Sequence, residues 1–438
     1  MSILEGLRPE TALHYFEELC AIPHGSRDTK RISDYCVRFA EAHGLRYVQD
    51  AHNNVVIYKS GSAGYENHPT VILQGHLDMV CEKDPCCDID FSKDGLRLKQ
   101  DGTYLFAEGT TLGGDDGIAV AYALAVLESE TLAHPPLEVV FTVDEEIGML
   151  GADAMDMSLL SGRVMLNIDS EDEGILTAGC AGGATATITL PVKRETAGGQ
   201  GWRVRVDGLT GGHSGVEIHK GRVNANKFMG ELLRKLPDVR LARVDGGAKD
   251  NAIPRSCEAL LVSQTPDFAE RFEAAKAACL AALPATEPHA VITCEAAEAA
   301  QAMTAECSAA ALDLLGELPN GVQAMSADIE GLVQTSLNLG IVKTAQESVT
   351  MTFSVRISVG AEKPALLTRL QALAEKYGAA YGQMGEYPAW EYRKDSCLRE
   401  TMVETFEALY GKKPVVDVIH AGLECGIFSD RLPGLDAV

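Results

Sequence analysis

Several classes of protein are excluded by what this sequence lacks. Its twelve cysteines include no CxxC pair, so neither a thiolate zinc site nor a dithiol redox centre is predicted. The longest apolar run, residues 117–127, is far shorter than the roughly 20 residues that cross a bilayer, and residues 1–16 lack the apolar core of a signal peptide. Basic residues are scarce: 38 Lys and Arg against 63 Asp and Glu give a formal charge of −25, which disfavours nucleic acids and anionic membranes as partners. We therefore expect a cytoplasmic protein with reduced thiols and no nucleic-acid or membrane partner.

The first third of the chain alternates helical patterns with short apolar runs. Helical spacing of apolar residues occurs at 11–20 and 29–42, a helix that is apolar all round is predicted at 118–127, and strand-like runs lie at 53–58, 71–73, 137–143 and 164–168. Continuous apolar runs favour strands that are buried on both faces. We therefore predict an α/β domain in which helices cover a mostly parallel sheet.

After the glycine-rich segment 179–183 the pattern changes. Residues 185–192, 202–207 and 349–358 alternate between apolar and polar, while 225–236, 268–283 and 364–377 carry helical apolar stripes. These patterns predict half-exposed antiparallel strands with helices on one face, which is a separate α+β domain. A buried strand at 415–419 then resumes the style of the first domain. We place the domains at 1–183, 184–385 and 386–438, the last continuing the first.

Each predicted strand of the first domain ends in groups that can bind a metal. The run 71–73 leads into QGHLD at 74–78, 137–143 into DEE at 144–146, and 164–168 into Asp169, while GGDDG at 113–117 opens the apolar helix. Ligands of open α/β sheets bind beyond the carboxyl ends of the strands, so these groups should converge. Imidazole together with carboxylates favours zinc, with cobalt or manganese as alternatives, over calcium. Any one of these acids could be an ordinary strand-end residue, but jointly they predict a metal centre and no organic cofactor.

Three segments resemble the motifs of the M20 metallopeptidases: QGHLD at 74–78, TTLGGDDG at 110–117 and DEEIG at 144–148. The order of motifs is most similar to the aminoacyl-histidine dipeptidase (peptidase D) type, and the resemblance extends from residue 22 to HAGLECG at 420–426. It implies an α/β zinc-peptidase catalytic domain, 1–183 with 386–438, and an inserted α+β lid domain, 184–385.

By this resemblance two divalent metal ions are expected. His76, Asp115 and Asp169 would hold one zinc ion, and Asp115 and Glu146 would hold the other, so that Asp115 bridges the two. Two such ions can share a hydroxide and polarise the scissile carbonyl. Glu145 would be the general base that takes a proton from the bridging water and passes it to the leaving amine.

The resemblance implies further roles around the metals and in the lid domain. Asp78 would orient His76 by accepting a hydrogen bond from its imidazole, and a cis peptide bond is expected after Asp115. His213 in GGHSG at 211–215 would stabilise the oxyanion of the tetrahedral intermediate, although the segment alone is typical of an exposed loop.

Two lid residues are implied in binding the C-terminal carboxylate of the substrate, Asn251 and Arg356. Arg356 lies on the polar face of an alternating strand, where it is free to point into a cleft, and a guanidinium matches a carboxylate bidentately. The alternative for Arg356 is an ordinary exposed arginine of a sheet.

Two questions stay open near the end of the sequence. His420 and Glu424 flank a glycine after the returning strand, where they would either line the cleft or have a structural role, and neither is assigned a metal. The family's second zinc has another histidine ligand in a His-Ser-Pro-like segment, which is not reached before Val438. Either this part of the catalytic domain is truncated in the sequence, or the protein naturally lacks the ligand. We therefore expect the site of His76 to hold metal more tightly than the site of Glu146.

The predicted function is metal-dependent hydrolysis of dipeptides, broad in specificity and including Xaa-His dipeptides such as β-alanyl-histidine. One alternative is another M20 amidohydrolase or carboxypeptidase that acts on N-acyl amino acids. A second alternative is a catalytically impaired homologue that binds metal or peptide and lacks the last metal ligand. A homodimer is left open by analogy with the family.

Overall fold

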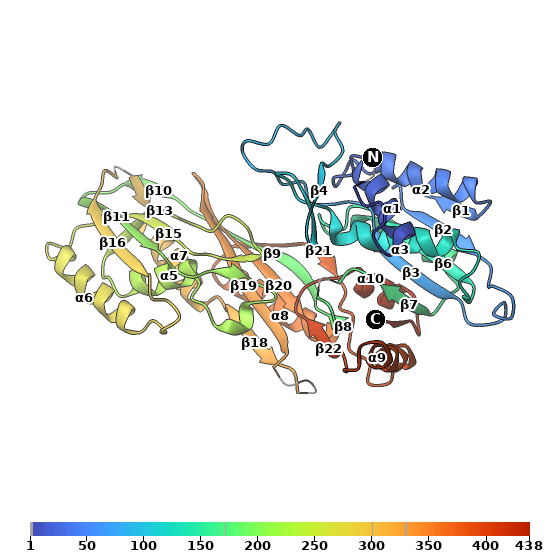
Figure 1. Cartoon of the computed structure of the whole chain (residues 1–438). Helices are drawn as coiled ribbons and strands as arrows, with labels where there is room; N and C mark the ends of the chain where they lie inside the picture. The colour runs from blue at the N-terminus through green and yellow to red at the C-terminus, as the bar shows by residue number, and fades with distance from the viewer. Residues whose placement is uncertain (1–2, 171, 300, 328, 330) are drawn as a thin grey trace. The chain divides into compact units, whose positions relative to one another are not determined.

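The computed structural model describes residues 3–170, 172–299, 301–327, 329 and 331–438, which divide into two compact units (Figure 1). Unit 1 comprises Met1–Cys180, Tyr392–Val418 and Leu423–Val438, and unit 2 comprises Ala181–Glu391 and Ile419–Gly422. The sequence patterns place the boundaries at 183/184 and 385/386 and do not anticipate that Ile419–Gly422 groups with unit 2. None of the described helices is long and apolar enough to cross a membrane.

Unit 1 is an α/β unit built around a six-stranded sheet. Its helices are α1 (Glu10–Cys20), α2 (Lys30–Ala42), α3 (Gly114–Glu128), α4 (Leu150–Ala154), α9 (Cys397–Tyr410) and α10 (Cys425–Arg431), with a 3-10 turn at Met157–Leu159. Its strands are β1 (Arg46–Gln49), β2 (Val55–Lys59), β3 (Val71–His76), β4 (Leu98–Asp101), β5 (Tyr104–Ala107), β6 (Leu137–Thr142), β7 (Val164–Asn167), β8 (Ile175–Cys180), β22 (Val415–Ile419) and β23 (Asp436–Ala437).

The sheet of unit 1 has the strand order β1-β2-β6-β3-β7-β23. β6, β3, β7 and β23 run parallel to one another, while β1 and β2 extend the sheet with antiparallel pairing. The predicted mostly parallel α/β sheet is therefore confirmed. α2 packs on β1 and β2, α3 packs on β3, and α1 packs on α3, so these helices cover one face (Figure 1). The carboxyl ends of β3, β6 and β7 consequently lie next to one another, which is where the predicted ligands follow.

Two predictions for unit 1 are wrong in detail. A helix that is apolar all round, as predicted at 118–127, implies full burial, but Tyr122 of α3 is 41% exposed, because the sheet and α1 cover only part of the surface of α3. β22 was expected to be a buried strand of the catalytic domain. It pairs instead with β8 in a separate two-stranded sheet, and Val415 is 60% exposed. The sheet position beside β7 is occupied by β23.

Among its described residues, unit 2 contains a nine-stranded antiparallel sheet and four α-helices. The helices are α5 (Ala225–Arg234), α6 (Phe268–Ala281), α7 (Ala305–Glu317) and α8 (Lys363–Lys376), with 3-10 turns at Ile218–Lys220 and Gly360–Glu362. The strands of the large sheet are β9 (Gly182–Pro191), β11 (Gln200–Asp207), β13 (Val239–Gly246), β15 (Cys257–Ser263), β16 (Val291–Ala296), β18 (Gly321–Met325), β19 (Val333–Thr344), β20 (Ser348–Ile357) and β21 (Ala380–Tyr387). Two small ribbons pair β10 (Arg194–Thr196) with β17 (Gln301–Met303), and β12 (Gly212–His213) with β14 (Ala252–Ile253).

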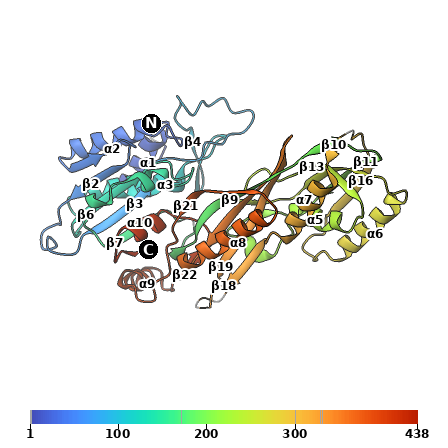
Figure 2. The same ribbon diagram turned by 180° about the vertical axis from the view of Figure 1, so that it is seen from behind.

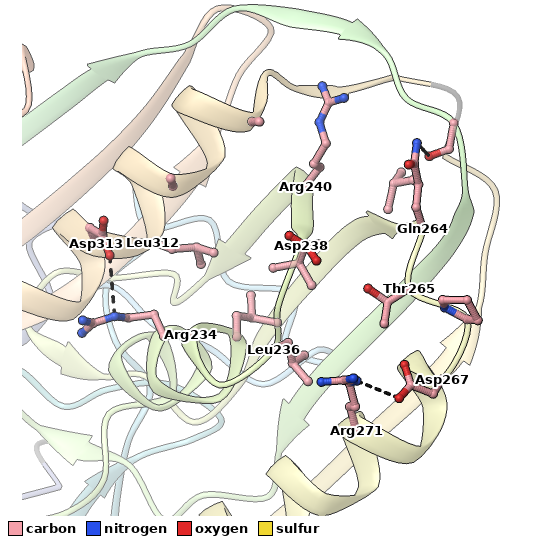
Figure 3. Close-up of a pocket in the computed structure, with 17 residues that line it drawn as sticks. Arg234, Leu236, Asp238, Arg240, Gln264, Thr265, Asp267, Arg271, Leu312 and Asp313 are labelled. Carbon is pink, nitrogen blue, oxygen red and sulfur yellow. Dashed lines mark hydrogen bonds and ion pairs between the residues drawn. The ribbon is translucent and has the colours of Figure 1, made fainter.

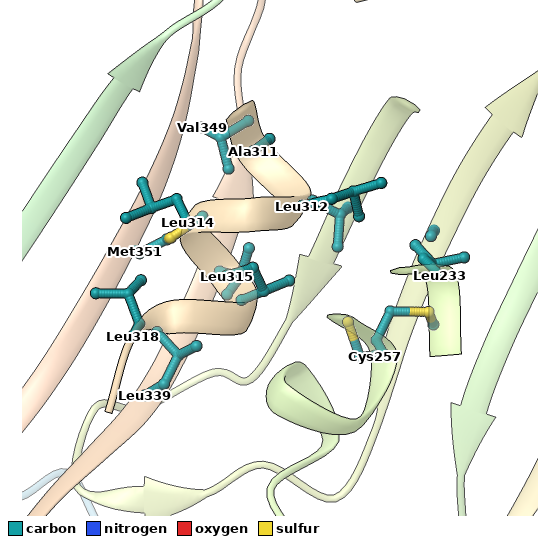
Figure 4. Close-up of a cluster of buried hydrophobic side chains, with 14 of the residues drawn as sticks. Leu233, Cys257, Ala311, Leu312, Leu314, Leu315, Leu318, Leu339, Val349 and Met351 are labelled. Carbon is teal, nitrogen blue, oxygen red and sulfur yellow. The ribbon is translucent and has the colours of Figure 1, made fainter. Parts of the chain in front are cut away.

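The alternation read from the sequence sets which face of this sheet is buried. Along β20, Val349, Met351 and Phe353 point into the core while the residues between them are partly exposed. α5, α7 and α8 lie on that face (Figure 2). Figure 4 shows how α7 closes the core: Leu314 lies beside Met351, and Leu318 lies beside Leu339 of β19. The sheet with helices on one face is the predicted α+β arrangement.

Candidate active site

Three predicted metal ligands come together in unit 1. His76 is the last residue of β3, Asp115 lies in the first turn of α3, and Glu146 lies in the loop after β6. One ligand atom of each residue lies within 4.8 Å of the ligand atoms of the other two. His76 is buried, Glu146 is half-buried and Asp115 is exposed. A buried imidazole beside two more accessible carboxylates is a donor set that zinc, cobalt or manganese accepts.

Asp169, the fourth predicted ligand, follows β7 at the same edge of the sheet. It lines a cavity of about 310 Å³ together with Asp115. It is not part of the cluster in which all ligand atoms lie within 4.8 Å, but its charge is near enough to raise the pKa of both His76 and Glu146. The structure therefore brings the four predicted ligands to one region of unit 1.

Asp78 organises the loop that carries the two adjacent glutamates. Its carboxylate is almost completely buried and accepts hydrogen bonds from the backbone N–H of Glu145 at 3.0 Å, from that of Glu146 at 3.4 Å and from Ser26 Oγ at 2.8 Å. The sequence predicts that this carboxylate is the partner of His76. The structure shows that His76 Nδ1 lies closer to the backbone oxygen of Asp78, at 2.9 Å, than to its carboxylate, at 3.5 Å.

The start of α3 presents one aspartate outward and one inward. The peptide bond between Asp115 and Asp116 is cis, as expected. Asp115 Oδ1 lies 2.9 Å from His76 Nε2, whereas Asp116 is 2% exposed and its Oδ2 accepts a hydrogen bond from the backbone N–H of His76 at 3.1 Å. Gly75 makes this contact sterically feasible, because a Cβ there would lie 2.5 Å from Asp116 Oδ2. Asp116 thus holds the end of β3.

The metal-ligand cluster has an excess of buried negative charge. Burial, reinforced by neighbouring carboxylates, raises the pKa of Glu145 to about 9, the pKa of Glu146 to about 7 and the pKa of Asp116 well above its usual range. Burial alone would lower the pKa of His76, but its hydrogen bonds with Asp115 and Asp78 outweigh that effect and raise it. A divalent cation would supply the missing positive charge and restore the ionised carboxylates. The residues present therefore fit a metal ion.

The predicted oxyanion group lies in unit 2, at the pairing of β12 with β14. His213 Nδ1 accepts hydrogen bonds from the backbone N–H groups of Gly215 and Val216, both at 3.2 Å, so the ring proton is on Nε2. Burial and the charge of Arg356 lower the pKa of His213. Its ring is therefore a neutral Nε2–H donor. Asn251 is exposed beside this segment, and its backbone oxygen accepts a hydrogen bond from Ser214 N at 2.8 Å.

Arg356 lies close to His213 and to His420 within unit 2. A Cβ on Gly215 would meet the His420 backbone oxygen, His213 Cε1 and Arg356 Cζ at 2.5, 2.9 and 3.1 Å, which shows how tightly these groups surround one point. Arg356 is 7% exposed, so it is not an ordinary surface arginine of the sheet. Its Nη1 donates to Tyr387 Oη at 3.5 Å, whereas its Nε is buried and lacks a hydrogen-bond partner among the residues described. A buried guanidinium with an unused N–H is suited to an anionic ligand.

His420 belongs to this group of residues in unit 2 and Glu424 does not. His420 is buried, and its Nε2 lies 2.7 Å from Ser336 Oγ. Burial and the charge of Arg356 lower its pKa to about 3, so the ring is neutral. Glu424 is buried in unit 1 and is bonded to side chains of β3 and β6. The two residues that the sequence left unresolved therefore have different surroundings.

A large cavity of unit 2 contains none of the predicted site residues. Its volume is about 950 Å³, and it lies between α5, the start of α6, α7 and the ends of β13 and β15 (Figure 3). Its arginines are already paired: Arg234 with Asp313, Arg271 with Asp267, and Arg240 with Glu195. These three arginines are therefore not free to bind an anionic ligand.

Sequence reasoning missed two residues that support the candidate site. Ser26 supports Asp78 and Asp116 supports His76, but neither was given a role. A signal existed for Asp116: adjacent residues at a helix start point in different directions, so only one of two aspartates can face a metal. Ser26 carries no such signal, because its contact depends on the packing of residues that are 52 positions apart.

A histidine and several carboxylates at the carboxyl edge of a mostly parallel sheet, with a second glutamate beside them, define a metal-dependent hydrolase. Residues 72–437 match the profile described as peptidase family M20/M25/M40, and the chain belongs to this family. Peptidases of the family depend on divalent metal ions.

Individual relatives agree with this assignment. The chain is 36% identical to the cytosol non-specific dipeptidase of Escherichia coli, across 100% of this chain and 92% of that protein. The crystal structure of an aminoacylhistidine dipeptidase from Vibrio alginolyticus is 37% identical and superposes with a TM-score of 0.89, covering 99% of this chain and 90% of that one. An aminopeptidase PepT from Bacillus cereus, 14% identical over 98% of this chain and 88% of its own with a TM-score of 0.53, shares the fold.

Proposed function

We propose that this protein is a cytoplasmic, divalent-metal-dependent dipeptidase of broad specificity that accepts Xaa-His dipeptides such as β-alanyl-histidine. The observation that carries the proposal is the cluster of His76, Asp115 and Glu146, whose ligand atoms all lie within 4.8 Å of one another. The names of the two similar proteins, a non-specific dipeptidase and an aminoacylhistidine dipeptidase, support the substrate class. Unit 1 would be the catalytic domain and unit 2 the lid domain.

Two divalent ions, with zinc preferred over cobalt or manganese, would be held by His76, Asp115, Glu146 and Asp169. Such ions, when bound, polarise a carbonyl group and make water more acidic. Asp78 supports the arrangement by fixing the backbone of the loop that carries Glu146, to which it is hydrogen-bonded.

Glu145 would be the general base. Its backbone N–H is held by Asp78, and its side chain lies among the charges of Glu146, Asp169 and His76, which all affect its pKa. In the reaction its carboxylate takes a proton from the attacking water and delivers it to the nitrogen of the leaving amine. A divalent cation nearby lowers the raised pKa of Glu145, so that the carboxylate is ionised and able to act as a base.

Unit 2 would supply the groups that bind the substrate. The neutral His213 donates through Nε2 to the oxygen that becomes negative in the tetrahedral intermediate. Arg356 and Asn251 bind the C-terminal carboxylate, and the buried Nε of Arg356 supports this role because it lacks a partner. A site of this kind would favour substrates that end in a free carboxylate.

The general base is tested by Glu145→Gln. We expect this variant to lose hydrolysis of β-alanyl-histidine by at least roughly 100-fold, while calorimetry finds metal binding nearly unchanged. Glu66→Gln, which changes an exposed glutamate of the same unit, is the matched control and should hydrolyse normally. Retained hydrolysis by the Glu145 variant would remove the assignment.

The carboxylate site is tested by comparing dipeptides with their C-terminal amides. Wild-type protein should prefer the free carboxylate by roughly 100-fold, and Arg356→Met should lose this preference. Arg194→Met is the control, because Arg194 donates to the backbone oxygens of Gln346, Ala242 and Ala345 and should leave the preference intact. Tripeptides and acetyl-amino acids complete the panel. Faster turnover of either class than of dipeptides would replace the dipeptidase assignment with another M20 activity.

A further inference from the structure

Glu424 is a buried acid whose contacts the proposed reaction does not use. It immediately precedes α10 and is 1% exposed. Its Oε2 accepts a hydrogen bond from Gln74 Nε2 at 2.5 Å and another from Thr142 Oγ1 at 2.6 Å. Its Oε1 is also buried and has no hydrogen-bond partner among the described residues. One carboxylate oxygen therefore joins two side chains from different strands.

The residues that Glu424 joins stand directly before the candidate metal ligands. Gln74 lies in β3 two residues before His76, and Thr142 ends β6 before the loop with Glu146. Gln74 extends the connection to the third strand, because Asn167 at the end of β7 donates from Nδ2 to Gln74 Oε1 at 2.5 Å.

The connection spans two neighbouring levels of the sheet. Gln74 pairs with Asn167 in the β3–β7 register, whereas Thr142 pairs with His76 in the β3–β6 register, two residues further along β3. The network therefore joins three strand ends at the level of His76 and at the level two residues before it. Backbone pairing alone holds the strands at their spacing, but side-chain bonds at these levels also fix how each strand end is rotated.

We propose that Glu424 is a positioning residue of the metal centre, which sets the relative placement of His76, Glu146 and Asp169 through Gln74 and Thr142. This inference rests on the proposed function, because it assumes that those residues bind metal.

The geometry favours positioning over a contribution to folding alone. A buried carboxylate oxygen without a partner is unfavourable for stability, and an apolar side chain of similar shape would avoid that cost. Unit 1 contains a contrasting buried acid, Glu138, which lies on β6 as Thr142 does. Its carboxylate accepts hydrogen bonds from Ser161 N, Ser161 Oγ and Gly162 N. Glu138 is four residues before Thr142 and away from the ligand edge. Its hydrogen bonds therefore contribute to folding and not to the placement of the ligands.

The experiment is metal binding by calorimetry, with Zn²⁺ or Mn²⁺ alone as the probe, on wild type, Glu424→Leu and Glu424→Gln. Glu424→Leu removes the network, and we expect metal affinity to fall 10–100-fold. Glu424→Gln keeps one acceptor oxygen and should show a smaller loss. Glu138→Leu is the matched control: it should unfold more easily and bind metal as wild type does.

Kinetic constants also distinguish positioning from a purely structural role of Glu424, because a purely structural role would leave kcat and KM of the folded enzyme unchanged. Wild-type protein and both Glu424 variants are compared with β-alanyl-histidine at saturating metal. We expect kcat to fall at least 10-fold with KM changed less than 3-fold, because the proposed carboxylate-binding residues lie in unit 2. If Glu424→Leu does not fold, Thr142→Val removes one hydrogen bond with little change of shape and should still lower metal affinity several-fold.

The outcomes separate this inference from the proposed function. Unchanged metal affinity and kcat in Glu424→Leu, or in Thr142→Val where the first variant does not fold, overturn the positioning role, provided that His76→Ala abolishes binding. If wild type binds no divalent metal, or if His76→Ala binds as tightly as wild type, the proposed metal centre is wrong and this inference falls with it. Equal losses of affinity in Glu424→Leu and Glu138→Leu also overturn the positioning role, because any buried acid of β6 or its neighbours would then produce the effect.

Discussion

The raised pKa of Glu145 makes the stability of the metal-free protein depend on pH in a predictable direction. Burial raises this pKa from 4.5 to about 9, so between these values the folded protein holds a proton that the unfolded chain has released. The folded state then binds more protons than the unfolded state, and the free energy of unfolding falls as pH rises. One proton corresponds to about 1.4 kcal/mol for each pH unit, or about 2.7 kcal/mol between pH 6 and pH 8. Glu145→Gln has no proton to release and should lack this contribution.

The assay must report on unit 1. Trp202 and Trp390 are the two tryptophans of the chain and both lie in unit 2, so tryptophan fluorescence would follow the wrong unit. Hydrogen exchange of the slowest amides of β3 and β6 reports unfolding of unit 1 directly. Metal is removed with a chelator, and exchange is compared at pH 6 and pH 8 after correction for the intrinsic rates.

We expect wild-type protein to lose about 2–3 kcal/mol more than Glu145→Gln between these two pH values. Because Glu145 keeps some contact with solvent, the lower end of this range is the better expectation. Repeating the comparison with divalent metal bound is the control, since the cation lowers the pKa of Glu145 and the difference should shrink. The same pH dependence in both metal-free proteins would show that Glu145 does not hold a proton there, and the account of an uncompensated acidic cluster would be refuted.

Two further substitutions test packing in each unit. Gly75→Ala places a Cβ 2.5 Å from Asp116 Oδ2. It should destabilise unit 1 by about 1–3 kcal/mol, measured by hydrogen exchange, and weaken metal binding. The control is Gly382→Ala in β21, where the new Cβ meets nothing within 4 Å and neither effect is expected. Lys227→Met removes the ammonium that donates to the backbone oxygens of Leu315, Gly316 and Leu318 at the end of α7, and should destabilise unit 2 by about 2 kcal/mol in urea followed by tryptophan fluorescence. The exposed Lys235 gives the matched control Lys235→Met, and equal unfolding curves for the two lysine variants would contradict the capping role of Lys227.

The strands that carry the candidate ligands could be predicted because their signals are local. β3, β6 and β7 are apolar runs that end directly at polar residues, and the sequence shows both the run and its end. The position of β22 could not be predicted in this way. Its Val-rich sequence resembles a buried strand, but burial depends on which strand it pairs with, and its partner β8 lies more than 200 positions earlier in a two-stranded sheet that leaves Val415 exposed.

The residues of the candidate site also fall into two groups, those that local sequence predicts and those that depend on tertiary contacts. His76, Asp115, Glu146 and Asp169 stand at strand ends or a helix start, where residue type and position suffice to nominate a ligand. The residues that support them are found only by tertiary contact: Gln74 and Glu424 are 350 positions apart in the sequence and 2.5 Å apart between their side-chain atoms. Arg356 shows the opposite case, since its strand position was visible in the sequence but its burial was not.

The two units carry complementary imbalances of charge, and this connects the parts of the proposed function. In unit 1, burial raises the pKa of Glu145 and Glu146, which indicates too little positive charge for the carboxylates present. In unit 2, the buried Arg356 lies near the imidazoles of His213 and His420. Burial and the charge of Arg356 lower the pKa of both rings, so both are neutral and the guanidinium has too little negative charge around it. A divalent cation corrects the first imbalance, and the carboxylate of a peptide corrects the second.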